Sequence, residues 1–342
     1  MTHFIPKTHY EAAVSYLKKV SGFDWLVDRV ITALGPEPSY EDFCREVMPE
    51  PVKDPAYAAN FLNIYFHLFN MNQGGSKIYY IMPELARRLA KTNLNIDSYY
   101  LKSPFREIFI QIDPGLFSIK DIDGSTVPIY GFYIFFNDTG EYKKVRIMAC
   151  SLLKPTLKIP FNDTTYYFRL EIPSGKLMDI ARKYIDNNIK EGSGYLQGKT
   201  IKNVDYTEEF TSFVFNVLLY LTSKNTDIIT QDPIDFKKKL VELKSPAKKR
   251  KLEQRLEKSN QYRLFVAGST LKENLEESKD LQKAGSIGAW KLAYRVRVSG
   301  HWRAQWYGSE KEGNKKSEVI WIEDYDKGPQ VADLLNRKVV VQ

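Results

Sequence analysis

The sequence predicts an α+β protein with a helical N-terminal part, a central, mostly antiparallel sheet with packed helices, and a β-rich C-terminal tail. Three observations support this fold class. Apolar residues recur at helical spacing through the first hundred residues, β-rich runs separated by turn-like segments follow Pro104, and strand-like alternation returns near the C-terminus. With 43% apolar and 27% charged residues, the composition excludes a mainly disordered or fibrous chain.

Four segments of the first hundred residues have the apolar spacing of helices. The third is apolar on nearly every side, as buried helices are, and the fourth has a proline near its first turn, where proline is favoured. Ser39, followed by two acidic residues, indicates a helix N-terminus. The four segments are residues 10–20, 24–34, 56–70 and 83–91.

The central part of the chain alternates between β-rich runs and turns. Turn residues at 121–124 and 137–140 separate successive runs, which favours an antiparallel meander over a parallel sheet. Two helices accompany the sheet, at about 174–188 and at 207–222, and the second has the composition of a core helix. The expected strands are residues 105–112, 127–136, 144–149 and 166–172.

The net charge of +8 is concentrated in one stretch of the chain. Residues 237–316 hold 21 lysines and arginines against nine acidic residues, a net of +12, whereas the remainder has a net of −4. Such an excess attracts nucleic acid, a ribosome surface or an acidic protein, but a solvated helix or linker has the same composition. We therefore expect a helical N-terminal region (1–103), an α+β core (104–232), a basic helical or linker segment (233–289) and an Arg/Trp-rich β tail packed on the core (290–342).

Motifs of the common catalytic sites are absent, including the P-loop, the dinucleotide-binding glycine motif, the nucleophile elbow and the zinc-protease motif. His67 lies within an apolar segment and is interpreted as a hydrogen-bonded core histidine. Cys44 and Cys150 are too few for a disulfide framework and indicate a reducing compartment, with Cys150 in the core. No signal peptide or membrane-spanning run is visible, so a soluble, cytoplasmic protein without cofactor or metal is expected, and a binding protein is favoured over an enzyme.

One group of side chains keeps an enzymatic alternative open. Glu323, Asp324 and Asp326 follow a predicted strand and could gather a divalent ion for phosphodiester hydrolysis, with His301 as a further catalytic candidate. The favoured interpretation of these carboxylates is a charged strand exit. A metal-dependent ribonuclease is the function that this alternative describes.

The tail combines arginines with aromatic residues. Three of the five tryptophans of the chain fall within 20 positions there. Arginine offers planar donors for phosphate or carboxylate, and tryptophan and tyrosine offer stacking faces, so the tail could hold single-stranded RNA or a peptide. Alternatively, it is a hairpin whose tryptophans pack on the main domain. The candidate binding residues are Arg295, Arg297, His301, Trp302, Arg303, Trp306 and Tyr307, together with Lys248, Lys249, Arg250 and Lys251 of the basic segment.

The block from Arg297 to Trp302 (Arg-Val-Ser-Gly-His-Trp), the Trp306-Tyr307-Gly308 sequence and the later run 319–322 resemble the C-terminal signature of a type V-A anti-CRISPR family. Members of this family lower production of the type V-A CRISPR nuclease. Weaker resemblance extends over roughly residues 100–330, in the strands near 105–115 and 131–134 and in the helix near 215–227.

The resemblance implies a protein of a phage or plasmid that recognises the N-terminal segment of the nuclease during translation and causes loss of its message. The implied partners are the nascent protein and, with the basic segment, RNA or the ribosome, in the cytoplasm of a bacterial host. A plasmid or phage nucleic-acid-binding accessory protein is a further alternative, although no DNA-binding module is evident in the sequence.

Overall fold

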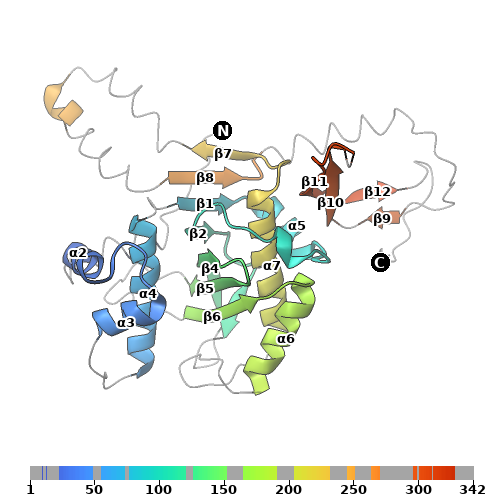
Figure 1. Ribbon diagram of the computed structural model, residues 1–342. Coiled ribbons are helices and arrows are strands. Elements are labelled where there is room, and N and C mark those ends of the chain that lie inside the picture. The colour runs from blue at the N-terminus through green and yellow to red at the C-terminus, as the bar shows by residue number, and fades with distance from the viewer. Residues whose placement is uncertain are drawn as a thin grey trace.

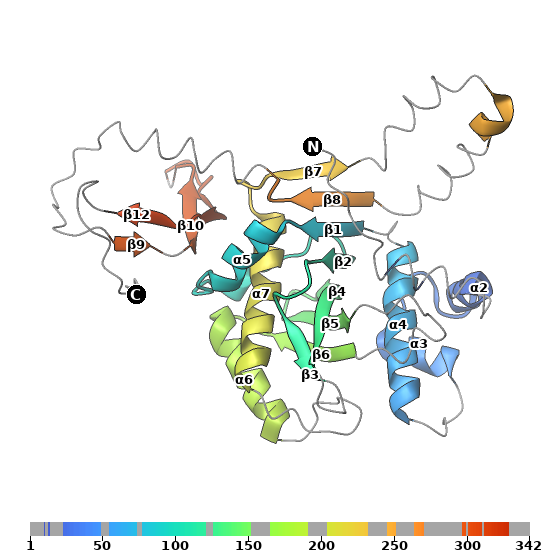
Figure 2. The same cartoon turned by 180° about the vertical axis from the view of Figure 1, so that it is seen from behind.

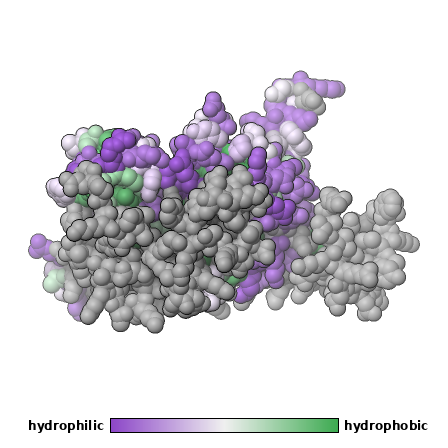
Figure 3. All heavy atoms as spheres, turned by 90° about the horizontal axis from the view of Figure 1, so that it is seen from below, coloured by the Kyte–Doolittle hydropathy of each residue, from purple (hydrophilic) through white to green (hydrophobic). Residues whose placement is uncertain are grey.

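The computed structural model describes residues 10, 13, 23–48, 55–73, 77–120, 126–151, 165–190, 204–231, 245–250, 263–269, 296–298, 300–309 and 311–327. They form a central mixed sheet with helices on both faces and a C-terminal hairpin beside it (Figure 1). Over these residues, no helix combines the length and the apolar character that a membrane span requires. In the view from below, the coloured surface is mostly hydrophilic and its hydrophobic residues lie in small patches (Figure 3).

The central sheet has the strand order β6-β5-β4-β2-β1-β8-β7, and β3 pairs with β4 outside this path. Strand β1 runs parallel to both β2 and β8, and the other pairs in this sheet are antiparallel. The expected mostly antiparallel sheet is therefore confirmed. The strands are β1 (Lys77–Ile81), β2 (Glu107–Gln111), β3 (Ser118–Lys120), β4 (Thr126–Asp138), β5 (Lys143–Ser151), β6 (Thr165–Ile172), β7 (Ile228–Gln231) and β8 (Arg263–Ala267).

Helices cover both faces of the sheet (Figures 1 and 2). One face carries α5 (Pro83–Lys91), α6 (Leu177–Lys190) and α7 (Val204–Thr222), and the other carries α2 (Phe23–Leu34), α3 (Tyr40–Val47) and α4 (Pro55–Gln73). Because side chains of a strand alternate between faces, β1, β2, β4, β5 and β8 each contribute to two cores. In β4, Phe132 and Ile134 join the core under α7, whereas Tyr133 and Phe135 join the core under α4.

Strands β1 and β8 come from stretches in which no strand was expected, and here the prediction was wrong. Strands β3 and β7 lie in the predicted α+β core but were not among the expected strands. β1 lies in the region predicted to be wholly helical, and β8 lies in the segment predicted to be helical or linker. Each has only five residues, which is too short for a clear period. Both are interior strands of the sheet, and their parallel pairing adds to the predicted meander.

Several local predictions are confirmed. The Ser39 hydroxyl caps α3 by accepting a hydrogen bond from the Asp42 backbone N–H, and Pro83 stands at the start of α5. His67 is fully buried and hydrogen-bonded, and Cys150 is a buried free cysteine. The expected turn at 121–124 and most of the segment 10–20 lie outside the described residues.

Candidate interaction surface on the C-terminal hairpin

The C-terminal hairpin consists of the antiparallel strands β10 (His301–Tyr307) and β11 (Lys316–Ile322). Alternation of side chains gives it an inner face toward α5 and α7 and an outer face. The inner face pairs Trp302 with Trp321, Ala304 with Val319 and Trp306 with Ser317; the outer face pairs His301 with Ile322, Arg303 with Ile320, Gln305 with Glu318 and Tyr307 with Lys316.

The base of the inner face is fixed in the protein core. Trp302 is 6% exposed and Trp321 is 3% exposed. The Trp302 indole N–H donates to Oδ1 of the buried Asn216 at 2.7 Å, and the Asn216 amide donates to the carbonyls of Leu89 and Thr92 at 2.9 and 3.0 Å. One α7 side chain thus ties the hairpin to the end of α5.

Further contacts hold β11 and the start of β10. The Asn225 side chain forms two hydrogen bonds with the Trp321 backbone, accepting from its N–H and donating to its carbonyl at 2.7 Å. The Tyr220 ring meets the Trp321 indole edge to face, with centroids 5.4 Å apart. The Asn93 N–H donates to the Gly300 carbonyl at 3.3 Å. The hairpin is therefore held by both side chains and backbone.

Two of the carboxylates considered as catalytic candidates, Glu323 and Asp324, lie beside an arginine. Arg88 of α5, whose side chain is 11% exposed, lies 3.0 Å from Asp324 and 3.4 Å from Glu323, and its Nε contacts Glu84 at 3.1 Å. Burial raises the pKa of Glu323, although Arg88 opposes this shift. Among the described residues, no group of three His, Cys, Asp or Glu side chains could hold a metal ion. Glu323 and Asp324 thus leave β11 beside a cation, as the charged strand exit describes.

The free end of the hairpin exposes its aromatic residues. Trp306 is 58% exposed and Tyr307 is 44% exposed. Lys315 lies over the Trp306 ring at 5.0 Å, and Lys224, which also pairs with Glu318 at 2.6 Å, lies over the Tyr307 ring at 5.4 Å. These contacts place a cation beside each exposed ring.

The turn that joins the two strands depends on a glycine. Gly308 has φ +82°, and a Cβ at this position would lie 2.5 Å from the Asn314 carbonyl oxygen. The Asn314 side chain closes the turn by accepting a hydrogen bond from the Ser309 N–H at 2.6 Å. The exposed rings are thus presented on a defined turn.

The predicted binding residues do not form one site. His301, Arg303, Trp306 and Tyr307 all lie on the hairpin, with Arg303 exposed and His301 half-buried, whereas Trp302 belongs to the core. Arg297 lies in β9 (Val296–Val298), opposite Asp326 of β12 (Tyr325–Lys327) in the register of that pair.

The basic segment is partly described. Lys248, Lys249 and Arg250 are exposed on a helical turn at 246–250, which Figure 1 draws at the opposite end of the molecule from the hairpin. Arg295 and Lys251 lie outside the described residues. Sequence reasoning did not identify Lys224 or Asn216; only the presence of a lone amide in an apolar helix could have pointed to Asn216.

The fold and the hairpin define a class of α+β proteins in which a helix-covered mixed sheet supports an anchored surface hairpin. A family model described as AcrVA2-like, the anti-CRISPR type V subtype A2 family, matches residues 79–325. This match spans most of the chain and includes the hairpin, so the protein belongs to that anti-CRISPR family. The resemblance seen in the sequence is thereby confirmed.

One solved structure, the crystal structure of AcrVA2, has the same fold. It superposes with a TM-score of 0.50 at 12% sequence identity, and the match covers 94% of this chain and 99% of that chain. At this identity the likeness concerns the fold. No curated protein matches the chain.

Proposed function

We propose that this protein lowers production of a type V-A CRISPR nuclease by recognising the N-terminal segment of the nuclease while it is being translated, with loss of the message as the result. The target is then a protein component of a CRISPR system, met in the cytoplasm of the bacterial host. The observation that carries the proposal is the hairpin, an anchored element with exposed aromatic residues inside the segment matched by the anti-CRISPR family.

The hairpin suits a polypeptide ligand. Tryptophan, tyrosine and arginine are the residues most enriched where binding energy concentrates in protein interfaces, and Trp306, Tyr307 and Arg303 are exposed on one strand. Because Trp302 and Trp321 fix the base of the hairpin, little conformational freedom is lost when a ligand binds. Gln305 on the outer face adds an amide that can pair with a peptide backbone.

The first test compares the level of nuclease mRNA in the presence of variants that lack exposed aromatic side chains at one of two places, the hairpin or α2. We expect wild-type protein to lower nuclease mRNA severalfold and the variant Trp306→Ala/Tyr307→Ala to restore most of it, because the ligand loses two stacking surfaces. Trp25→Ala is the matched control, since Trp25 is 64% exposed and lies beneath Arg29, but belongs to α2 on the other side of the sheet. Quantitative mRNA measurement and thermal melting of each variant provide the readout.

A frameshift distinguishes recognition of the nascent protein from recognition of RNA. Shifting the reading frame of the first codons changes the nascent segment and leaves the mRNA almost intact. The proposal requires the mRNA loss to disappear in the shifted message. An equal loss from both messages would contradict recognition of the protein segment.

The basic segment is proposed to contact RNA or the ribosome. Replacing Lys248, Lys249, Arg250 and Lys251 together by Gln should weaken RNA affinity. The slope of log affinity against log salt is negative, and it should become less steep by about 0.7 for each phosphate that is no longer neutralised. The melting temperature should stay unchanged, because the three described side chains of this set are exposed. A large fall in melting temperature would instead assign the run a structural role.

A further inference from the structure

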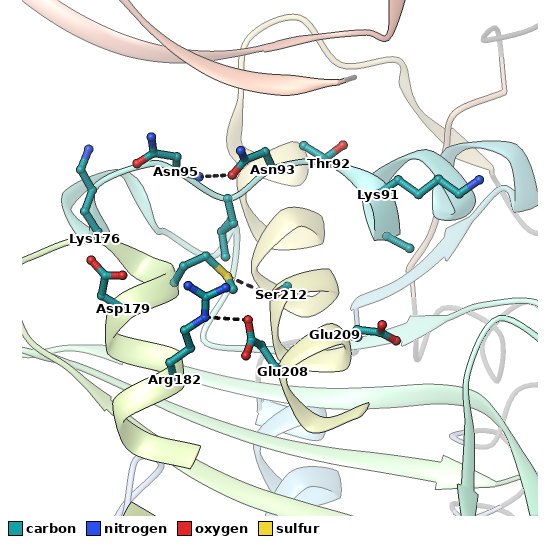
Figure 4. A pocket seen from close by; sticks show the side chains of 13 residues that line it. Lys91, Thr92, Asn93, Asn95, Lys176, Asp179, Arg182, Glu208, Glu209 and Ser212 are labelled. Atoms are coloured by element: carbon teal, nitrogen blue, oxygen red, sulfur yellow. Dashed lines mark hydrogen bonds and ion pairs between the residues drawn. The ribbon is translucent and has the colours of Figure 1, made fainter. Parts of the chain in front are cut away.

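A polar cleft lies between α6, α7 and the segment that follows α5 (Figure 4). Its volume is about 730 Å³, within the range of ligand-binding pockets. Ala90, Leu94 and Met178 supply its apolar lining, and Ser212 of α7 contacts the Met178 sulfur. The cleft is separate from the outer face and the exposed end of the hairpin.

The walls of the cleft carry opposite charges. Lys91, Asn93, Asn95 and Lys176 line one side, and Asp179, Glu208 and Glu209 line the other (Figure 4). Arg182 and Glu208 neutralise each other in an ion pair of 2.8 Å. Within the part of the chain that the structure describes, Lys91, Lys176, Asp179 and Glu209 form no ion pair. Two cations and two carboxylates therefore remain available to a ligand.

This distribution of charge selects among ligand classes. A nucleotide or another polyanion would meet Asp179 and Glu209, and a polycation would meet Lys91 and Lys176. A purely apolar ligand would pair with none of the charges on either wall. A polypeptide segment with side chains of both signs satisfies both walls, and its backbone amides can pair with the side-chain amides of Asn93 and Asn95.

The cleft is continuous with the base of the hairpin. Asn93 forms a parallel bridge with His301, and its N–H donates to the Gly300 carbonyl at 3.3 Å. We propose that the cleft binds a short extended segment of the target polypeptide that carries both acidic and basic side chains. This inference rests on the proposed function in taking the target to be a polypeptide, and it assigns that target a second contact site.

Peptide binding to the full chain tests the cleft. Short overlapping peptides covering the N-terminal part of a type V-A nuclease, each with a scrambled version, are measured by fluorescence polarisation. The variant Lys176→Glu/Glu209→Lys reverses one charge on each wall without changing the net charge. For those peptides that bind the wild-type protein, this variant should lower the affinity roughly tenfold. Lys183→Glu/Glu141→Lys, a matched exchange at two exposed positions outside the cleft, should leave binding unchanged.

The outcomes separate the cleft from the proposed function. If scrambled peptides bind as well as native ones and both lose affinity on charge reversal, the cleft stands and recognition of the nuclease sequence fails. If native peptides bind with an affinity that reversal does not change, the cleft assignment is overturned and the function stays with the hairpin. Absence of peptide binding overturns the cleft assignment. The cleft assignment is also overturned if the protein binds single-stranded RNA, if this binding requires Lys176 and if Glu209→Lys strengthens it.

Discussion

Replacing Trp302 by alanine should lower the free energy of unfolding by about 3–5 kcal/mol, the range for removal of a large buried aromatic side chain. The indole is 6% exposed, and its N–H is bonded to the fully buried Asn216. Its removal leaves a cavity and an Asn216 carbonyl oxygen that has lost its donor, and both effects destabilise the fold. Urea denaturation followed by circular dichroism measures the change.

Trp306→Ala is the matched control for this prediction. Both tryptophans lie on the inner face of β10, but Trp306 is 58% exposed, so its removal should change stability by less than about 0.5 kcal/mol. The stability of Trp302→Phe should fall between those of the two alanine variants, because phenylalanine keeps an aromatic ring in the core and loses the N–H donor and part of the volume. A Trp302→Ala protein within about 1 kcal/mol of wild type would contradict the anchoring of the hairpin.

The second large effect concerns a buried pair of titratable groups under α4. His67 Nδ1 and Glu107 Oε1 lie 2.9 Å apart, with side chains that are 0% and 1% exposed. Burial, assisted by Arg146, lowers the pKa of His67 from 6.5 to about 3, and burial raises the pKa of Glu107 well above 4.5. The folded pair thus holds one proton over a wide pH range, whichever atom carries it.

The unfolded chain holds a different number of protons at either extreme. Below pH 4.5 both groups are protonated in the unfolded chain, so the depressed pKa of His67 in the folded state makes stability fall as pH decreases. Above pH 6.5 neither group is protonated in the unfolded chain, so the raised pKa of Glu107 in the folded state makes stability fall as pH increases. Between these values the two effects cancel. We expect a stability contribution that is greatest between pH 4.5 and 6.5 and declines by about 1.4 kcal/mol per pH unit on either side.

A variant without titratable groups isolates this contribution. In His67→Phe/Glu107→Leu the pair is replaced by apolar side chains of similar shape, which buried pairs commonly tolerate. The difference in unfolding free energy between wild type and variant, measured by urea denaturation across the pH range, should follow the predicted maximum. A difference that does not vary with pH would show that the pair exchanges no protons on unfolding.

Much of the fold follows from local sequence patterns. The apolar spacing of α4 and α7, the Ser39 cap and the β-rich runs of β4 and β5 predict their elements within a few residues. Strands β1 and β8 could not be predicted in this way, because each is a five-residue run that owes its conformation to two neighbouring strands far away in the sequence.

The candidate site shows a similar division. Interleaved arginine and aromatic residues point to the stretch that forms the hairpin, but strand alternation puts Trp302 and Trp306 on the same face and cannot separate them. Only the position of α7 and α5 buries the first and leaves the second exposed. Likewise, the role of Glu323 and Asp324 depends on Arg88, which is more than 200 residues away in the chain and has no local signal.

The central claim is that the exposed end of the hairpin recognises the nascent nuclease. Binding to stalled ribosomes tests this claim most directly. Ribosomes are stalled once the N-terminal segment of the nuclease has emerged, and co-sedimentation measures how much protein they retain. Wild type should bind these complexes and not ones with a frameshifted segment, and Trp306→Ala/Tyr307→Ala should reduce binding roughly tenfold or more. Equal binding to both complexes, or unchanged binding of the double variant, would contradict the claim.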